Sequence, residues 1–203
     1  RFYVPQSDSG GHTVNGIVYD AGLNLLYTSF LQDIYAVNAS TGAQAWHYQI
    51  PNDYGIVGPL NLCNGKLCFG ANVDDSLYLG QIDPVGALQS GAPAAVPSAA
   101  LPNGLLGVTM GAPAGDGSGT VYLVYALPNG DGTATYNVGA VRSADGALAW
   151  SRALHAGTDT FSPADCLVAQ FAVPNTASTQ PALFVNAGTS IYALSLADGS
   201  VLG

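Results

Sequence analysis

The sequence has no glutamate and very few basic residues. All 13 acidic side chains are aspartates, and the basic residues are Lys66, Arg1, Arg142 and Arg152. Glu, Lys and Arg normally cover the exposed faces of helices, so long surface helices are not expected. The chain has instead 26 glycines, 12 prolines and 11 tyrosines. This composition is typical of many short strands joined by tight turns.

The shortage of basic residues also argues against several classes of partner. The net charge is −9 at pH 7, whereas nucleic acids and anionic membranes are bound by clustered Lys and Arg. The sequence contains no run of about 18 apolar residues, the length that spans a bilayer. We therefore expect neither a nucleic-acid partner nor membrane insertion. A cleaved secretory signal would leave a chain that begins on a residue other than Met, as Arg1 does, so we expect an extracellular protein.

Two of the three cysteines flank a hairpin signal. Cys63 and Cys68 lie on either side of Asn64-Gly65, a pair that favours a two-residue turn. A strict two-residue turn pairs Cys63 with Lys66 and leaves Cys68 diagonal to it, as a buried thiol. A looser four-residue loop places the two cysteines opposite each other, at bridging distance. A Cys63–Cys68 disulfide and two buried thiols therefore both fit the sequence, and Cys166 has no partner.

One phrase recurs four times: an apolar strand, a polar turn that ends in glycine, and a strand of small residues. Its copies end on Gly42, Gly86, Gly146 and Gly199. These glycines recur at intervals of roughly 40 to 60 residues, which suits a four-stranded structural repeat. Each copy has the period-2 character of a strand before its turn. Two copies carry a tryptophan shortly after the glycine, namely Trp46 and Trp150.

The two tryptophan-bearing copies are specific enough to indicate a family. Ala-Val-Asn-Ala-Ser-Thr-Gly-Ala-Gln-Ala-Trp at 36–46 and Ala-Val-Arg-Ser-Ala-Asp-Gly-Ala-Leu-Ala-Trp at 140–150 resemble the tryptophan-docking (PQQ-type) repeat of quinoprotein-alcohol-dehydrogenase-like β-propellers. The other two copies have Ser90 and Gly203 at the tryptophan position. In that family the turn joins the third and fourth strands of a blade, and the tryptophan packs between neighbouring blades. The resemblance covers four units and most of the chain.

The resemblance predicts an all-β fold, a single β-propeller over 1–203 built of four-stranded antiparallel blades. The blades are expected at about 13–49, 56–90, 105–154 and 164–203, with an irregular loop over 91–104. The last strand of the second blade is expected at 87–90, and almost no helix is expected. Propellers of this family resemble an eight-bladed ring, so four blades form half of such a ring, part of a longer chain, or a compact four-bladed ring. Open apolar flanks on the terminal blades would favour self-association.

The resemblance also implies a cofactor, for which the sequence offers little support. The dehydrogenases of this family bind pyrroloquinoline quinone with calcium, use a catalytic aspartate and in many members have adjacent cysteines. This chain has no adjacent cysteines, no glutamate to bind calcium and few basic residues to hold a quinone with three carboxylates. We therefore expect no catalytic residue, no cofactor and no metal.

Other candidate sites have simpler structural explanations. Asp- and Gly-rich turns offer calcium ligands, but tight turns use the same residues. These turns lie at 74–75, 115–119 and 129–133. The histidines are dispersed and no Gly-x-Ser-x-Gly nucleophile motif accompanies them; they are His12, His47 and His155. Three tyrosines occupy equivalent repeat positions, which packing explains; they are Tyr35, Tyr78 and Tyr192. Asn38 opens an Asn-Ala-Ser motif, the N-glycosylation acceptor of secreted eukaryotic proteins.

The leading hypothesis is an extracellular, non-catalytic β-propeller that acts as a protein interaction or assembly module. Function in such scaffolds lies in surface loops and faces, which the fold alone does not identify. The candidate partner surfaces are the blade edges and the loops 89–104, 113–119 and 156–163. One alternative is a fragment of a quinone-dependent dehydrogenase. Another is a carbohydrate-binding propeller in which Tyr54, Tyr136 or Trp150 stacks on sugars.

Overall fold

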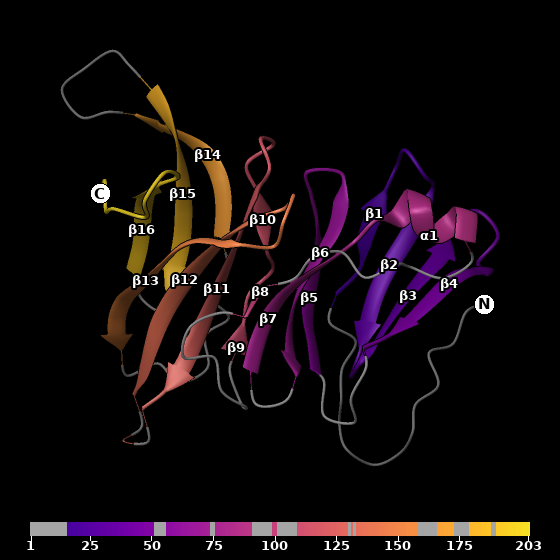
Figure 1. The fold of residues 1–203 in the computed structure, drawn as a ribbon, viewed down its shortest axis with the longest axis horizontal. Coiled ribbons are helices and arrows are strands. Elements are labelled where there is room, and N and C mark those ends of the chain that lie inside the picture. The colour runs from indigo at the N-terminus through magenta and orange to yellow at the C-terminus, as the bar shows by residue number, and fades with distance from the viewer. Residues whose placement is uncertain are drawn as a thin grey trace.

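The protein forms four antiparallel β-sheets that stand side by side in chain order (Figure 1). The computed structural model describes residues 16–50, 56–73, 76–90, 99–100, 109–129, 131, 133–157, 166–172, 179–187 and 190–203. In Figure 1 the first sheet lies at one end of the row and the fourth at the other. The all-β architecture is therefore as the sequence predicts.

The first sheet has its strands in the order β1-β2-β3-β4. They are β1 (Val18–Asp20), β2 (Leu25–Phe30), β3 (Asp33–Asn38) and β4 (Gln44–Gln49). Tyr27, Ala36 and Trp46 lie in one cross-strand row and are all buried. Since side chains alternate between the two faces of a strand, this row directs its aromatic rings toward the second sheet, with which they form one core cluster.

The second sheet departs from the repeat at its outer edge. Its elements are β5 (Ile56–Cys63), β6 (Lys66–Val73), β7 (Ser76–Ile82), α1 (Pro84–Ser90) and β8 (Ala99–Ala100). The strand expected at 87–90 is helical instead, and Gly86 lies inside α1 rather than in a turn. The Asp83 side chain accepts a hydrogen bond from the Val85 N–H at 3.0 Å, and Pro84 fits the first helical position. The outer strand of this sheet is β8, which pairs with β7.

The third and fourth sheets follow the same order of strands. The third contains β9 (Thr109–Met110), β10 (Ala114–Gly115), β11 (Thr120–Pro128), β12 (Ala134–Arg142) and β13 (Leu148–Gly157). The fourth contains β14 (Cys166–Ala172), β15 (Thr179–Ala187) and β16 (Ser190–Ser195). Four strands were expected in the blade over 164–203, but the fourth is reduced to a bridge between Leu194 and Val201.

Three apolar clusters fill the spaces between successive sheets. One joins the first and second sheets, one the second and third, and one the third and fourth. The first strands of neighbouring sheets also meet: β5 contacts β1 and β10, and β10 contacts β14. Each sheet is thus packed face to face on the next, as a blade. Within the described residues, no helix is long and apolar enough to cross a membrane.

Candidate functional site: the interfaces between sheets and the open flanks

Three of the four repeat turns share one hydrogen-bond frame. In the first, the Asn38 N–H donates to the Ala43 carbonyl, and the Gly42 N–H donates to the Asn38 carbonyl. The turns that begin at Arg142 and Ser195 have the same two bonds. The glycine that closes each turn has a positive φ, of 72° at Gly42, 69° at Gly146 and 70° at Gly199. This left-handed conformation is the reason the turn ends on glycine.

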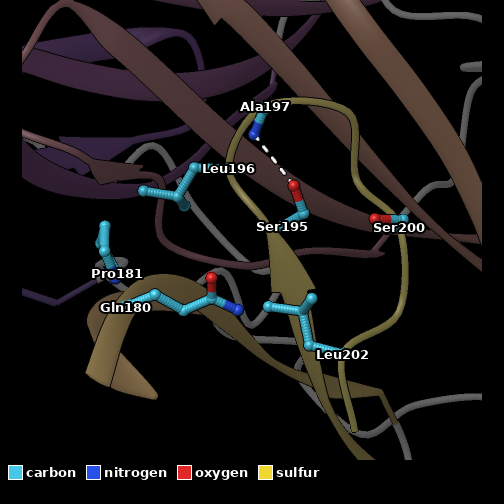
Figure 2. A pocket seen from close by; sticks show the side chains of 7 residues that line it. All are labelled: Gln180, Pro181, Ser195, Leu196, Ala197, Ser200 and Leu202. Atoms are coloured by element: carbon cyan, nitrogen blue, oxygen red, sulfur yellow. Dashed lines mark hydrogen bonds between the residues drawn. The ribbon is translucent and has the colours of Figure 1, made fainter. Parts of the chain in front are cut away.

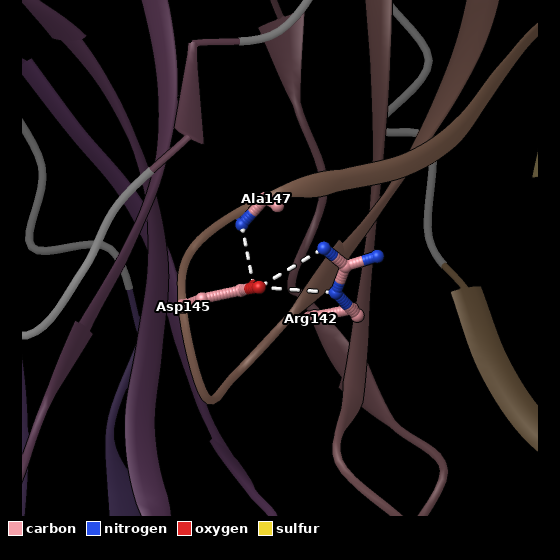
Figure 3. A network of polar contacts seen from close by, with 3 residues as sticks. All are labelled: Arg142, Asp145 and Ala147. Carbon is pink, nitrogen blue, oxygen red and sulfur yellow. Dashed lines mark hydrogen bonds and ion pairs between the residues drawn. The ribbon is translucent and has the colours of Figure 1, made fainter.

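The third-sheet turn carries an ion pair on its surface. Figure 3 shows the Asp145 carboxylate between the Arg142 guanidinium, at 2.9 Å, and the Ala147 N–H, at 3.0 Å. The hydrogen bond from Arg142 and then that from Ala147 lower the pKa of Asp145. In the first-sheet turn, Asn38 Oδ1 accepts the N–H groups of Ser40 and Thr41 instead. Glycosylation of Asn38 stays a prediction.

Trp150 fastens the third sheet to the turn of the fourth. Its indole N–H donates to the Leu196 carbonyl at 3.0 Å, and the Tyr122 hydroxyl donates to the same oxygen at 3.5 Å. A Cβ atom on Gly199 would lie only 2.7 Å from the Trp150 ring. The ring of Tyr122 lies 5.8 Å from that of Trp150. We call Tyr122, Trp150, Leu196 and Gly199 the Trp150 dock.

Trp46 occupies the matching place between the first and second sheets but meets a different neighbour. It is 2 % exposed and belongs to the same core cluster as Ala87 of α1. Among the described residues its indole N–H has no hydrogen-bond partner. Because α1 replaces the repeat turn, the second sheet offers Trp46 a helix rather than a turn carbonyl.

Two asparagines, which the repeat did not reveal, fasten the second sheet to the third. The Asn61 side chain donates to the Pro113 carbonyl at 2.8 Å. Asn64 donates from Nδ2 to the Thr120 carbonyl at 3.1 Å and accepts the Gly117 N–H at 2.7 Å. Asn64 has a φ of 53°, as its Asn-Gly turn requires. The turn signal was visible in the sequence, but its contact with a segment some fifty residues away was not.

The structure contains free thiols at Cys63 and Cys68 in place of the disulfide alternative. Cys63 pairs with Lys66 and Cys68 pairs with Asn61, so the hairpin has its two-residue turn. The two cysteines are therefore diagonal, and both are buried. Burial raises the pKa of the Cys68 thiol well above its usual value, which disfavours the reactive thiolate. Cys166 is also a free thiol.

The aspartates of the Gly-rich turns hold those turns closed. The Asp116 carboxylate accepts the N–H groups of Ser118, Gly119 and Thr120. Burial opposes its ionisation, but hydrogen bonds from Ser118 and Thr120 outweigh this effect and lower the pKa of Asp116. The side chain and N–H of Thr133 lower the pKa of Asp131 in the same way. Asp74-Asp75 lies outside the described residues.

The first sheet brings together one histidine and one carboxylate. His47 Nε2 lies 2.7 Å from Asp33 Oδ1, and the imidazole stacks on the Tyr35 ring with centroids 4.7 Å apart. Burial, and then the charge of Asp33, raise the pKa of Tyr35. Asp33 and Tyr35 lie on β3 and His47 lies on β4, so the pairing of these two strands brings the three residues together. The sequence alone did not show this. His12 lies outside the described residues, and His155 lies on β13.

A hollow of about 310 Å³ opens beside the last turn (Figure 2). Its lining residues are Gln180, Pro181, Ser195, Leu196, Ala197, Ser200 and Leu202. The aromatic residues expected to stack on sugars are elsewhere: Tyr136 is buried in the core and Trp150 is engaged in its dock. Tyr54 lies outside the described residues. The expectation that Tyr136 or Trp150 forms a sugar platform is therefore corrected.

The described residues do not form a site for pyrroloquinoline quinone and calcium. Arg142 is paired with Asp145, and Arg152 lies near enough to Asp198 to help lower the pKa of that carboxyl, after the hydrogen bonds from Ser200 and Ser195. Their charges are thus directed at turn aspartates on the surface. In the described part of the chain, no three His, Cys, Asp or Glu side chains gather as metal ligands.

The two ends of the row expose apolar side chains. On the fourth sheet, the residues that alternate with Leu167 and Ile191 pack against the third sheet, so these two face outward. Leu167 is 55 % exposed and Ile191 74 %. On β1, Val18 packs toward the second sheet, so Tyr19 faces the other way and is 54 % exposed. Ile17, just before β1, is 68 % exposed. We call these the two flanks.

Antiparallel sheets packed face to face in succession, with an apolar cluster between each pair, define a β-propeller fold, and known structures agree. No family model and no curated protein matches the chain. Quinohemoprotein alcohol dehydrogenase ADHIIG from Pseudomonas putida HK5 is similar at a TM-score of 0.58 and 14% identity, over 89% of this chain and 32% of that one. The β-propeller domain of Cps50 (Swd1) from Myceliophteria thermophila is similar at 0.53 and 14% identity, over 91% and 55%. The chain therefore spans about a third and about half of these neighbours.

Proposed function

We propose that this chain is a non-catalytic propeller module whose flanks bind protein, including other copies of itself, outside the cell. The observation that carries the proposal is the exposure of Leu167 and Ile191 on the outer face of the fourth sheet. Large apolar residues gathered on an ordered sheet face favour association, because burying them releases water. Within the chain, neighbouring sheets are joined in the same way, by apolar side chains on facing surfaces.

The repeat itself supports descent from the PQQ-type scaffold without its chemistry. Three turns share the repeat frame, and Trp150 donates its indole N–H to the turn of the next sheet. Two of the described basic residues, Arg142 and Arg152, lie beside turn aspartates rather than in a common pocket. We therefore assign the repeated turn frame to architecture and the flanks to binding.

The test is the oligomeric state of the native chain by analytical ultracentrifugation over a range of concentrations. We expect concentration-dependent association, and we expect Leu167→Ser with Ile191→Thr to weaken it at least about tenfold, the effect of losing two buried apolar side chains. Leu148→Thr is the matched control, because Leu148 is 37 % exposed on the third sheet, away from the flanks. A chain that stays monomeric and captures no partner protein would contradict the binding role.

A separate measurement tests the non-catalytic part. The chain is supplied with pyrroloquinoline quinone and calcium, and dye-linked oxidation of alcohols and sugars is followed. We expect no turnover and no quinone absorbance retained after gel filtration. Retained quinone together with turnover would establish the dehydrogenase alternative instead.

A further inference from the structure

The first and third sheets hold the same three side chains in the same places. The matching pairs are Asp20 with Asp116, Tyr27 with Tyr122, and Trp46 with Trp150. In each sheet the tyrosine and the tryptophan pair with one alanine between them, and the two rings lie 5.8 Å apart. Each aspartate accepts backbone N–H groups of the turn before the tyrosine strand.

In the third sheet these groups converge on one oxygen from the next sheet. The Leu196 carbonyl accepts the Trp150 indole N–H at 3.0 Å and the Tyr122 hydroxyl at 3.5 Å. The same hydroxyl shares its single proton with Asp116 Oδ2, which accepts it at 3.4 Å. The polar edge of both rings is therefore satisfied inside the interface.

In the first sheet the equivalent donors are buried without that oxygen. Trp46 is 2 % exposed and Tyr27 is fully buried, and among the described residues neither Trp46 Nε1 nor Tyr27 Oη has a partner within hydrogen-bond distance. The Tyr27 hydroxyl nevertheless faces Asp20, because burial, and then the charge of that carboxylate and a hydrogen bond to it, raise the pKa of Tyr27. In the second sheet the helix α1 stands in the place of the repeat turn that would supply this carbonyl. Buried donors without partners are costly, and internal waters occupy such positions in proteins.

We propose that an ordered water molecule sits between Trp46 Nε1 and Tyr27 Oη, in the place that the Leu196 carbonyl occupies in the Trp150 dock. The water accepts a hydrogen bond from the indole N–H of Trp46 and forms a second hydrogen bond with the hydroxyl of Tyr27. Asp20 is the remaining acceptor: its Oδ1 already accepts the N–H groups of Gly22 and Leu23, and its Oδ2 accepts a hydrogen bond from the water. In this proposal a water molecule accepts the tryptophan N–H between the first and second sheets, whereas a backbone carbonyl accepts it between the third and fourth sheets.

Nuclear magnetic resonance tests this directly, because the chain has two tryptophans and hence two indole N–H signals. We expect the Trp46 signal, assigned through Trp46→Phe, to show a cross-peak to a long-lived water, and the Trp150 signal to show none. Tyr27→Phe removes relay through the exchanging hydroxyl, and the cross-peak should persist. Absence of the Trp46 cross-peak, or its loss in Tyr27→Phe, would overturn the proposal. So would a crystal structure with a carbonyl of 84–90 on the indole.

A double-mutant cycle gives a second readout. Tyr27→Phe should lower the folding equilibrium constant about fivefold, the effect of one hydrogen bond, and clearly less in the Trp46→Phe background, because the two groups share the water. Tyr122→Phe with Trp150→Phe is the matched control that shares the Leu196 carbonyl. An unchanged or higher constant for Tyr27→Phe, as expected on removing a dry unsatisfied hydroxyl, would overturn the proposal.

Discussion

Trp46 and Trp150 stand at the same repeat position, yet they close two different kinds of interface. Trp150 lies over a glycine turn and donates its N–H to a backbone carbonyl. Trp46 is the more deeply buried of the two and packs in a cluster with Ala87 of a helix. Hydrophobic burial is thus kept at both places, whereas the directional hydrogen bond to the next sheet is present only at the second.

The difference lies in the receiving sheet and not in the tryptophan. At Trp150 the neighbouring sheet supplies the repeat turn from Ser195 to Ser200, in which Gly199 has a left-handed backbone conformation. At Trp46 the neighbouring sheet supplies a helix instead, which Asp83-Pro84 starts. A repeat protein can therefore lose one docking turn and keep the interface between two sheets, provided that packed apolar side chains replace the hydrogen bond to the turn.

Gly199→Ala should be the most damaging single change in this comparison. The added methyl group would meet the Trp150 ring at 2.7 Å, at a residue whose φ is 70°. We expect a loss of about 3 kcal/mol in the free energy of unfolding, from left-handed strain together with overpacking. Urea denaturation measures this value.

Gly65→Ala separates the two causes. Gly65 has a φ of 77° and open space where the methyl group would lie, so it carries the strain without the clash. We expect a loss of about 1 kcal/mol there. Equal losses at both glycines would show that the Trp150 ring does not press on the turn.

The strands and their turns were predictable because they depend on local signals. Period-2 alternation and a closing glycine predicted a four-stranded blade at about 13–49, the segment that contains β2, β3 and β4. The expected strand at 87–90 was wrong because Gly86 was interpreted as the closing glycine of a turn. Asp83-Pro84 was the competing signal, since it combines an N-cap residue with the proline of a first helical turn.

The contacts between sheets were largely out of reach of the sequence. Asn64 binds Gly117 and Thr120, a contact that depends on packing between segments distant in sequence. Within the first sheet, Asp33 meets His47 through the register of β3 and β4. Tyr27 and Tyr122 were detectable in principle, because each follows an Asp turn and precedes a repeat tryptophan. The disulfide alternative depended on turn length, which the structure fixes at two residues.

Ala87→Gly tests the helix that receives Trp46. Ala87 is fully buried in the cluster that contains Trp46, and glycine removes a packed methyl group and weakens the helix. We expect a loss of about 1 to 2 kcal/mol in the free energy of unfolding. Leu88→Ala is the control on the same helix, where the side chain is 40 % exposed, and it should change stability by less than about 1 kcal/mol. A larger loss for Leu88→Ala would indicate that the helix packs through its other face.

Acid should weaken the third sheet through Asp116, with the smallest of these effects. Its pKa is lowered in the folded state from the usual 3.8, so its ionised form stabilises the fold above about pH 4, and this contribution is lost as the pH falls through the folded pKa. Asp116→Asn keeps an oxygen for the Ser118, Gly119 and Thr120 N–H groups but does not titrate. We therefore expect the unfolding free energy of the variant, followed by urea denaturation from pH 6 to pH 2.5, to fall less steeply below pH 4 than that of the native chain. The slope should not vanish, because Asp131, Asp145 and Asp198 also have lowered pKa values. Parallel curves would show that the turn before Tyr122 is held by its backbone rather than by the charge of Asp116.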